Sequence, residues 1–144
     1  MAHLQPITPE NWRCGLRVRE DQREYVADSD AILSRAYAYR NSRSEVLLIY
    51  NDETPVGMAL YYDLGELHTY NFSQFFIDHR YQQRGDGAEA VRLILQRMKT
   101  DGMFHKVVLC YVDGDNPAKR LYEKFGFRLT GEAEEDEIVM ELTL

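Results

Sequence analysis

The pattern of apolar and polar positions predicts two helices in the first forty residues. Thr8 is a capping residue followed by proline, which suits the first position of a helix, so a helix is predicted from there to about Leu16. A second helix begins at Ser29 or Asp30, and one face of it carries residues at helical spacing: Ile32, Ala36 and Tyr39. The charged segment between the two helices, residues 17–28, has no clear periodicity.

From residue 46 onward, β-branched and aromatic runs alternate with turns. Residues 46–50 and 56–62 are apolar runs on either side of a polar turn at 51–53, which predicts a hairpin. Residues 67–78 form a third, longer run that is rich in Tyr and Phe, and these residue types favour a strand.

The second half of the chain predicts a helix, a strand, a short helix and a closing hairpin. Apolar positions from Ala90 to Met98 recur at helical spacing, and the helix is expected to end near Gly102. The remaining elements are expected at residues 107–112, 117–124, 127–129 and 138–144. The last two are strands that can pair across an acidic turn at residues 132–137.

The predicted order is strand, two helices, three strands, helix, strand, helix and two strands. Because this order mixes hairpins with one crossover, it predicts an α/β protein of the α+β type with a mixed central sheet rather than a doubly wound one. The chain has 144 residues and contains no repeat or linker-like tract, so we expect a single domain over residues 1–144.

The charge of the chain argues against some classes of partner. It carries 17 Lys and Arg against 24 Asp and Glu, a net charge of −7, and no basic run is longer than two residues. Nucleic-acid binding is therefore not expected, whereas an acidic surface attracts cations such as polyamines. With no apolar stretch near 18 residues and no signal-like N-terminus, we expect no membrane contact and a cytoplasmic location.

The two cysteines indicate neither a metal site nor a disulfide framework. Cys14 and Cys110 are far apart, and neither has neighbours at metal-ligand spacing. Cys110 ends the apolar run 107–110, so a reduced and buried thiol is expected there. No metal is expected.

A glycine-containing loop, residues 82–88, joins the third predicted strand to the following helix. The N-terminus of a helix has unpaired backbone N–H groups and partial positive charge, and Gly85 and Gly87 allow close approach of an anion. The loop can therefore hold a pyrophosphate, although a tight strand-to-helix turn requires such glycines too. It is not the dinucleotide fingerprint, because no third glycine stands at the right offset.

A second segment, residues 116–127, carries a motif that changes the interpretation of the loop. Together the two segments resemble the GNAT superfamily of acetyl-CoA-dependent N-acetyltransferases, and the resemblance extends over nearly the whole chain. The first family motif is matched by Gln82, Gly85 and Gly87. The second, an Asn-initiated helix with a closing Gly-Phe pair, is matched by Asn116, Ala118, Leu121, Tyr122, Gly126 and Phe127.

The resemblance implies acetyl-CoA as cosubstrate and a set of residues that bind it. The pantetheine arm would contact two strand residues and the first residue of the second motif, and backbone amides of the loop would hold the pyrophosphate: Phe76, Ile77, Gln82, Gln83, Arg84, Gly85, Asp86, Gly87, Ala88 and Asn116. Two residues depart from the family pattern. His79 stands where Pro is frequent, and Asp86 stands between the glycines, where we expect it to face solvent.

The resemblance also implies that Tyr122 lies near the thioester sulfur. With a reference pKa near 10 against about 8.5 for a thiol, it is a candidate general acid. The alternative is a tyrosine that only packs a short helix. The general base is open between four titratable residues and a water chain: Asp78, His79, Glu66 and His68. Ser73 and Gln74 lie near where some relatives carry an acidic residue.

For the acceptor, residues 16–27, 73–78 and 81–82 resemble bacterial spermine/spermidine and diamine N-acetyltransferases. This implies a polyamine substrate, with tentative contacts from Glu20, Asp21, Glu24 and Gln74. The acids at 20–24 alternate with arginines and can equally form a solvated helix face. Other readings are acetylation of a peptide N-terminus, an amino acid or a drug amine, and a non-catalytic acyl-CoA-binding module. Dimers are common in such enzymes, so a homodimer is one expectation.

Overall fold

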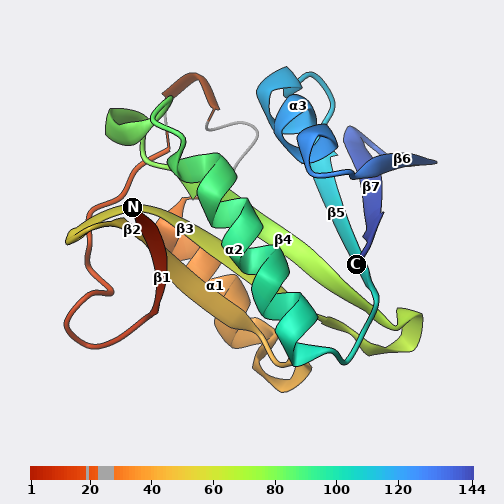
Figure 1. The fold of residues 1–144 in the computed structure, drawn as a ribbon, viewed down its shortest axis with the longest axis horizontal. Helices are drawn as coiled ribbons and strands as arrows, with labels where there is room; N and C mark the ends of the chain where they lie inside the picture. The colour runs from red at the N-terminus through yellow and green to blue at the C-terminus, as the bar shows by residue number, and fades with distance from the viewer. Residues whose placement is uncertain (19, 23–27) are drawn as a thin grey trace.

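A computed structural model describes residues 1–18, 20–22 and 28–144, and within them seven strands form one mixed sheet (Figure 1). The strands are β1 (Ala2–Pro6), β2 (Glu45–Asn51), β3 (Thr54–Leu64), β4 (Thr69–Ile77), β5 (Lys106–Val112), β6 (Arg128–Glu134) and β7 (Glu137–Thr143). Their spatial order is β1-β2-β3-β4-β5-β7-β6. The pair β4–β5 is parallel and the other neighbouring pairs are antiparallel, so the predicted mixed α+β sheet is confirmed.

Three α-helices in the described residues flank the sheet: α1 (Ser29–Ala38), α2 (Asp86–Asp101) and α3 (Asn116–Lys124). Short 3-10 turns connect some of the elements: η1 (Glu20–Gln22), η2 (Arg40–Ser42), η3 (Gly65–Leu67) and η4 (His79–Tyr81). None of these helices is long and apolar enough to cross a membrane.

The predicted helix from Thr8 to about Leu16 is wrong, because this segment forms turns. The backbone N–H groups of Asn11 and Trp12 both donate to the Thr8 carbonyl, at 3.2 and 3.1 Å, and the turn is not extended into a helix. The Asn11 side chain accepts from the Thr8 N–H at 2.7 Å and donates to the Pro6 carbonyl at 2.9 Å. Such side-chain bonds compete with a helical backbone.

The second predicted helix is present as α1, with a different cap. Asp28, rather than Ser29 or Asp30, accepts the hydrogen bond from the Ala31 N–H at 2.9 Å. Ile32 and Ala36 are buried as the periodicity predicts.

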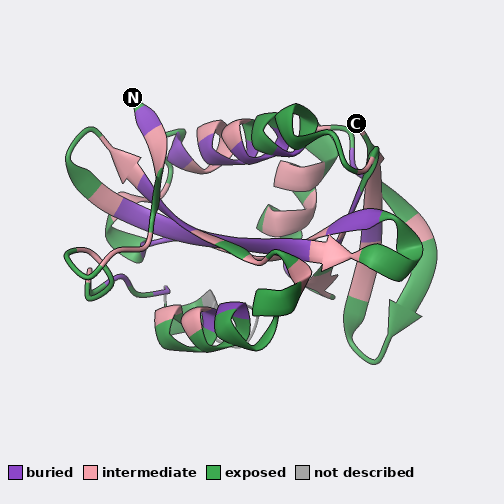
Figure 2. Ribbon diagram, turned by 90° about the horizontal axis from the view of Figure 1, so that it is seen from below, coloured by how far each residue is buried: buried purple, intermediate pink, exposed green. Residues whose placement is uncertain are grey.

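The two helices α1 and α2 cover opposite faces of the sheet (Figure 2). Residues of α2 spaced along one face, from Ala90 to Met98, are buried in a core with Leu47, Tyr70 and Leu109. On the other face, Ile32 and Ala36 of α1 pack with Leu48, Met58 and Leu60. Because α1 contacts β2 and β3, the opposite half of that face, over β5 and β7, is not covered by it.

The strands β4 and β5 separate after a short parallel ladder, which is the feature that positions the site (Figure 1). Three residue pairs join them, ending at Phe72 and Leu109. On its other edge, β4 shifts register against β3, because Leu60 is opposite Gln74 and Tyr61 is opposite Phe72. Ser73 therefore has no partner in β3. An extra residue of this kind bends a strand and re-aims its side chains.

Candidate active site

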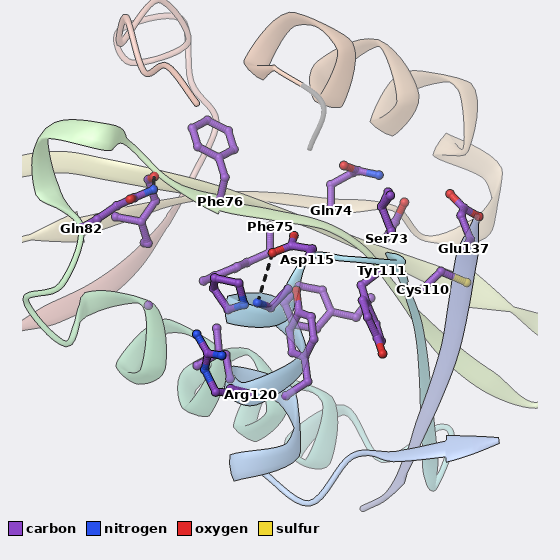
Figure 3. Close-up of a pocket in the computed structure, with 18 of the residues that line it drawn as sticks. Ser73, Gln74, Phe75, Phe76, Gln82, Cys110, Tyr111, Asp115, Arg120 and Glu137 are labelled. Carbon is purple, nitrogen blue, oxygen red and sulfur yellow. Dashed lines mark hydrogen bonds between the residues drawn. The ribbon is translucent and has the colours of Figure 1, made fainter. Parts of the chain in front are cut away.

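A cleft of about 580 Å³ lies where β4 and β5 separate (Figure 3). Its walls come from the end of β4, the loop before α2, the end of β5 and one side of α3, with single side chains from α1, β3 and β7. The volume is in the range of small-molecule sites, and the lining is mixed: aromatic rings alternate with a few polar groups.

The facing edges of the two strands do not pair with each other beyond Phe72 and Leu109. The outer edge of β4 is bonded to β3 up to Ile77, and the outer edge of β5 is bonded to β7 up to Val112. Backbone groups on the inner edges are therefore available to an extended molecule that carries amides, as in the addition of a strand to a sheet.

Of the two β4 residues expected to bind the cosubstrate, Ile77 has its backbone groups on this edge, where its carbonyl also accepts from Gln82 Nε2 at 3.1 Å. The backbone groups of Phe76 point to Met58 of β3 instead, because the Asp78 N–H donates to the Val56 carbonyl and backbone groups alternate in direction along a strand.

The loop at residues 82–88 has the geometry of an anion site. Gln83 and Gly85 adopt positive φ angles of 63° and 85°. Gly85 is the N-cap of α2 and provides no side-chain cap for the first N–H groups. A Cβ at Gly85 would meet no protein atom within 4 Å, so the space beside the loop is open. The first turn of a 16-residue helix thus presents uncapped N–H groups at the cleft, where Gly87 is part of the lining.

The expectation that Asp86 faces solvent is wrong. Its residue is 5% exposed, and its Oδ1 accepts a hydrogen bond from Asn51 Nδ2 at 2.9 Å. Its Oδ2 has no hydrogen-bond partner among the described residues. The side chain points toward the sheet because the start of α2 is packed beside β1 and β2. Asp86 therefore does not line the cleft, although its charge lies at the positive end of α2.

Asp78 is a structural carboxylate rather than a general base. It is fully buried, and its carboxylate accepts hydrogen bonds from the Arg80 guanidinium, from the Arg80 N–H at 2.9 Å and from the Arg17 N–H at 2.8 Å. Burial alone raises the pKa of Asp78, but these hydrogen bonds outweigh it and lower the pKa to about 2. The group is ionised at neutral pH and is fully engaged.

The other candidate bases also lie away from the cleft. Glu66 and His68 are at the opposite end of β4, at the η3 turn, and the His68 ring packs against Phe104 with centroids 6.2 Å apart. His79 is exposed, and its backbone N–H donates to the Arg17 carbonyl at 3.2 Å. None of these is among the described residues that line the cleft.

Tyr122 lies in the cleft, on α3. Its ring makes edge-to-face contacts with Phe72 and Phe127, with centroids 6.1 and 5.8 Å apart. Burial raises the pKa of the Tyr122 phenol well above its usual value, and the nearby Asp115 carboxylate raises it further. The phenol therefore keeps its proton across the physiological range, so it can donate a hydrogen bond.

The helix α3 is capped by Asp115, one residue before the expected Asn116. The Asp115 carboxylate accepts from the Ala118 N–H at 3.3 Å, and burial raises its pKa. Asp115 is 7% exposed and lines the cleft, whereas Asn116 is exposed and is not part of the lining. Either residue type can cap a helix, so the sequence alone does not decide between them.

The side of the cleft nearest α1 carries the residues that could meet an acceptor. Figure 3 shows Ser73, Gln74 and Glu137 pointing to this side, with Arg120 on the other side, next to α3. Arg35 of α1 donates to Ser73 Oγ at 3.2 Å. Of these residues, Gln74 was expected from the sequence, whereas Arg35 and Glu137 were not, because their approach depends on how α1 and β7 pack.

The acids expected to bind the substrate are not brought into the cleft where the structure describes them. Glu20 and Asp21 belong to η1, are exposed and are not part of the lining. Glu24 lies outside the described residues. No group of three His, Cys, Asp or Glu side chains in residues 1–18, 20–22 and 28–144 is arranged to hold a metal.

The expectation of a buried Cys110 is wrong as well. Alternation along β5 buries Val107 and Leu109 under α2, so Cys110 faces the other side of the sheet, which α1 does not cover. The thiol is exposed and lines the cleft.

A diverging strand pair beside an uncapped helix N-terminus forms a site for an extended molecule that carries amides at one end and an anionic group at the other. The chain matches the acetyltransferase (GNAT) family over residues 5–127. It belongs to this family and is an acetyl-CoA-dependent N-acetyltransferase.

Relatives with known names agree with this family. The chain is 28% identical over 138 residues to the spermine/spermidine N(1)-acetyltransferase of Bacillus subtilis, covering 90% of each chain. The spermidine N-acetyltransferase of Vibrio cholerae, solved in complex with CoA and spermine, has a TM-score of 0.79 at 17% identity, covering 99% of this chain and 95% of that chain. A putative acetyltransferase from Salmonella typhimurium, solved with acetyl-CoA, has a TM-score of 0.74 at 16% identity, covering 99% and 94%. At these identities the solved structures establish the fold.

Proposed function

We propose that residues 1–144 form one acetyltransferase domain that transfers an acetyl group from acetyl-CoA to a primary amine of a polyamine such as spermine or spermidine. The observation that carries the acceptor is the 28% identity, over 90% of both chains, to a spermine/spermidine N(1)-acetyltransferase. The net charge of −7 supports a cationic substrate, since an acidic protein concentrates cations at its surface.

The donor side of the cleft fits acetyl-CoA. The inner edge of β4 at Ile77 would offer backbone hydrogen bonds to the pantetheine arm, and the amides of residues 83–88 would hold a pyrophosphate at the start of α2. Phe76 lines the cleft, but its backbone groups point to β3. Asp86 takes part through its backbone, because its side chain points away. Gln82 donates to the Ile77 carbonyl at 3.1 Å and so holds the loop against the end of the strand. The contacts of Asn116 and Arg84 with acetyl-CoA remain predictions.

The bound cosubstrate supplies a thioester whose acetyl group an amine can take directly. Tyr122 would stabilise the negative charge that develops on the departing sulfur by donating its phenolic proton in a hydrogen bond. The raised pKa of Tyr122 favours this donation over complete release of the proton. This narrows the role expected from the sequence, in which Tyr122 is a general acid with a pKa near 10.

The amine must lose a proton before it reacts. For an alkyl amine with a pKa of about 10.4, freeing the lone pair at pH 7 costs about 4.6 kcal/mol. None of the four base candidates is among the described residues that line the cleft. Ser73 and Gln74 do line it, so we propose that the proton leaves through a chain of water molecules beside these two side chains.

One observation favours a rival acceptor. The Arg35 guanidinium stands at the acceptor side, and it would suit the carboxylate of an amino acid or peptide. An amine panel decides between them: thiol release from acetyl-CoA is measured with spermine, spermidine, free amino acids and a peptide. Activity with polyamines that weakens as salt is raised supports the proposal. Activity on peptides or amino acids beside none on polyamines contradicts it. CoA binding without turnover on any amine would instead indicate a non-catalytic module.

A further inference from the structure

Two side chains of opposite charge stand on the acceptor side of the cleft. Arg35 comes from α1 and is held to β4 by its hydrogen bond to Ser73 Oγ at 3.2 Å. Glu137 is the first residue of β7 and is opposite Val112, the last residue of β5. Figure 3 shows Glu137 beside Cys110, across from Ser73. The acceptor side therefore has a positive wall at α1 and a negative wall at β7.

The negative wall extends beyond Glu137. Glu134 is its direct partner across the β6–β7 hairpin, and like charges in such a pair repel. Partial desolvation raises the pKa of the Cys110 thiol, and the negative charges of Glu137, Glu134 and Glu132 raise it further. Of these three carboxylates, Glu137 lines the cleft. A cation bound here would relieve the repulsion.

These carboxylates differ from others of the protein in their pairing. Within the described part of the chain, Glu89 pairs with Arg92 and Glu141 with Lys106, but none of the ion pairs found there involves Glu132, Glu134 or Glu137. Two carboxylates line the cleft among the described residues, Asp115 and Glu137. Asp115 caps α3 on the other side, so Glu137 is the carboxylate on the acceptor side.

We propose that Glu137 binds the ammonium group adjacent to the reacting amine of a diamine or polyamine, and that the rest of the substrate leaves the cleft along β7, away from Arg35. The inference rests on the proposed function and specifies its acceptor site. It assigns to Glu137 the role expected of Glu20 and Asp21, which do not line the cleft. Arg35 repels a cation and so directs the chain toward Glu137, which makes Arg35 and Glu137 determinants of specificity with opposite effects.

The test compares a substrate that carries two further ammonium groups besides the reacting one with a substrate that carries none. Steady-state kinetics are measured with spermidine and with n-butylamine, a monoamine, for the wild type, Glu137→Gln and Glu53→Gln. Glu53 lies in the exposed turn between β2 and β3, so its variant carries the same change of charge away from the cleft. We expect Glu137→Gln to raise KM for spermidine about five- to tenfold, the size of one partly exposed charge-assisted contact, with KM for n-butylamine changed less than about twofold.

Arg35→Gln gives the second arm of the experiment. Removing a repulsive cation should lower KM for spermidine more than KM for n-butylamine, because spermidine brings further positive charges to the acceptor side, and a rise for spermidine would overturn the assigned direction. An equal effect of Glu137→Gln on both amines, or an effect no larger than that of Glu53→Gln, would overturn the role of Glu137 while leaving polyamine acetylation in place. A wild type that releases thiol with amino acids or peptides but not with spermidine removes the proposed function and this inference together. Melting temperatures of the variants control for folding.

Discussion

The Asp78 carboxylate accepts a hydrogen bond at 2.8 Å from the backbone N–H of Arg17, which is 61 positions earlier in the chain. The His79 N–H donates back to the Arg17 carbonyl at 3.2 Å, so two bonds hold this part of the N-terminal segment against the end of β4. On either side of Arg17, Leu16 and Val18 are buried in the core under α1. The end of β4, which lines the cleft, is thus fixed from outside the sheet.

Asp78→Asn should lower the free energy of unfolding at pH 7 by about 2 kcal/mol, because charge-assisted hydrogen bonds to a buried carboxylate are lost. The folded pKa is depressed to about 2 from an ordinary 3.8, so this stability is present above pH 4 and is lost as the pH falls toward 2. Urea unfolding of both proteins at pH 7, 4 and 2.5 should give a difference that shrinks with the pH. A difference that is constant with pH would contradict the assignment.

Tyr122→Phe should lower kcat by about a hundredfold and leave the Kd for acetyl-CoA unchanged, because it removes one hydrogen-bond donor from the transition state. Since the pKa of Tyr122 is raised, the wild type should show no alkaline decline of kcat up to pH 10 from this group. Stopped-time thiol release and calorimetry measure the two quantities. Tyr37→Phe, at an exposed tyrosine of α1, is the control. An unchanged kcat in Tyr122→Phe would remove its role.

Gly85→Val should raise the Kd for CoA more than tenfold. At φ 85°, a side chain strains the backbone by about 1–2 kcal/mol, and it would project into the open space that the pyrophosphate needs. Gly15→Val is a matched control: its φ is 69°, a Cβ there also meets no atom within 4 Å, and it does not line the cleft. Both variants should lose similar stability in thermal unfolding. If both lost CoA affinity equally, strain rather than the anion site would be the cause.

Asp86→Asn should tighten acetyl-CoA binding about two- to fivefold at low salt, because it removes a buried negative charge from the end of α2 that receives the pyrophosphate. The same change should lower the melting temperature of the free protein slightly, since the carboxylate favours the helix N-terminus. Glu89→Gln, in the same turn but ion-paired with Arg92, is the comparison and should have a smaller effect. Weaker binding in Asp86→Asn would indicate that the carboxylate positions the loop through Asn51 instead.

Most elements after residue 45 could be predicted because their signals are local. The exception is β6, which extends to Glu134, so the expected strand over residues 127–129 is too short and most of the acidic turn expected at 132–137 is strand. Period-two and helical patterns place β2, β3, β5 and α2 within a few residues of their bounds. The prediction of an N-terminal helix is wrong because the Asn11 side chain bonds to the backbone of Thr8 and of Pro6, which a pattern of apolar positions does not reveal. The prediction that Cys110 is buried is wrong for a different reason. An apolar run in a strand does not reveal which face of the sheet a helix will cover.

Half of the ten residues expected on the donor side line the cleft, namely Phe76, Ile77, Gln82, Gln83 and Gly87. Their motifs are contiguous in the sequence, whereas Arg84, Gly85, Asp86, Ala88 and Asn116 are not part of the lining.

On the acceptor side, the sequence points to Gln74 but not to Arg35 or Glu137. Arg35, Ser73 and Glu137 come from α1, β4 and β7, and they meet only because the extra residue in β4 and the separation from β5 bring these elements to one opening. Glu20 and Asp21, the acids to which the family resemblance points, are not part of the cleft lining.

The short ladder between β4 and β5 has a consequence for how the protein opens. Residues 70–72 of β4 and 107–109 of β5 are the paired positions that join a four-stranded part of the sheet to a three-stranded part. Amide hydrogen exchange in β5, β6 and β7 can therefore proceed through a partial unfolding that leaves β1 to β4 intact. A molecule bonded to both inner edges would couple the two parts and slow exchange in each. Protection of the amides at Val107 and Leu109 would then report occupancy of the cleft without any measurement of turnover.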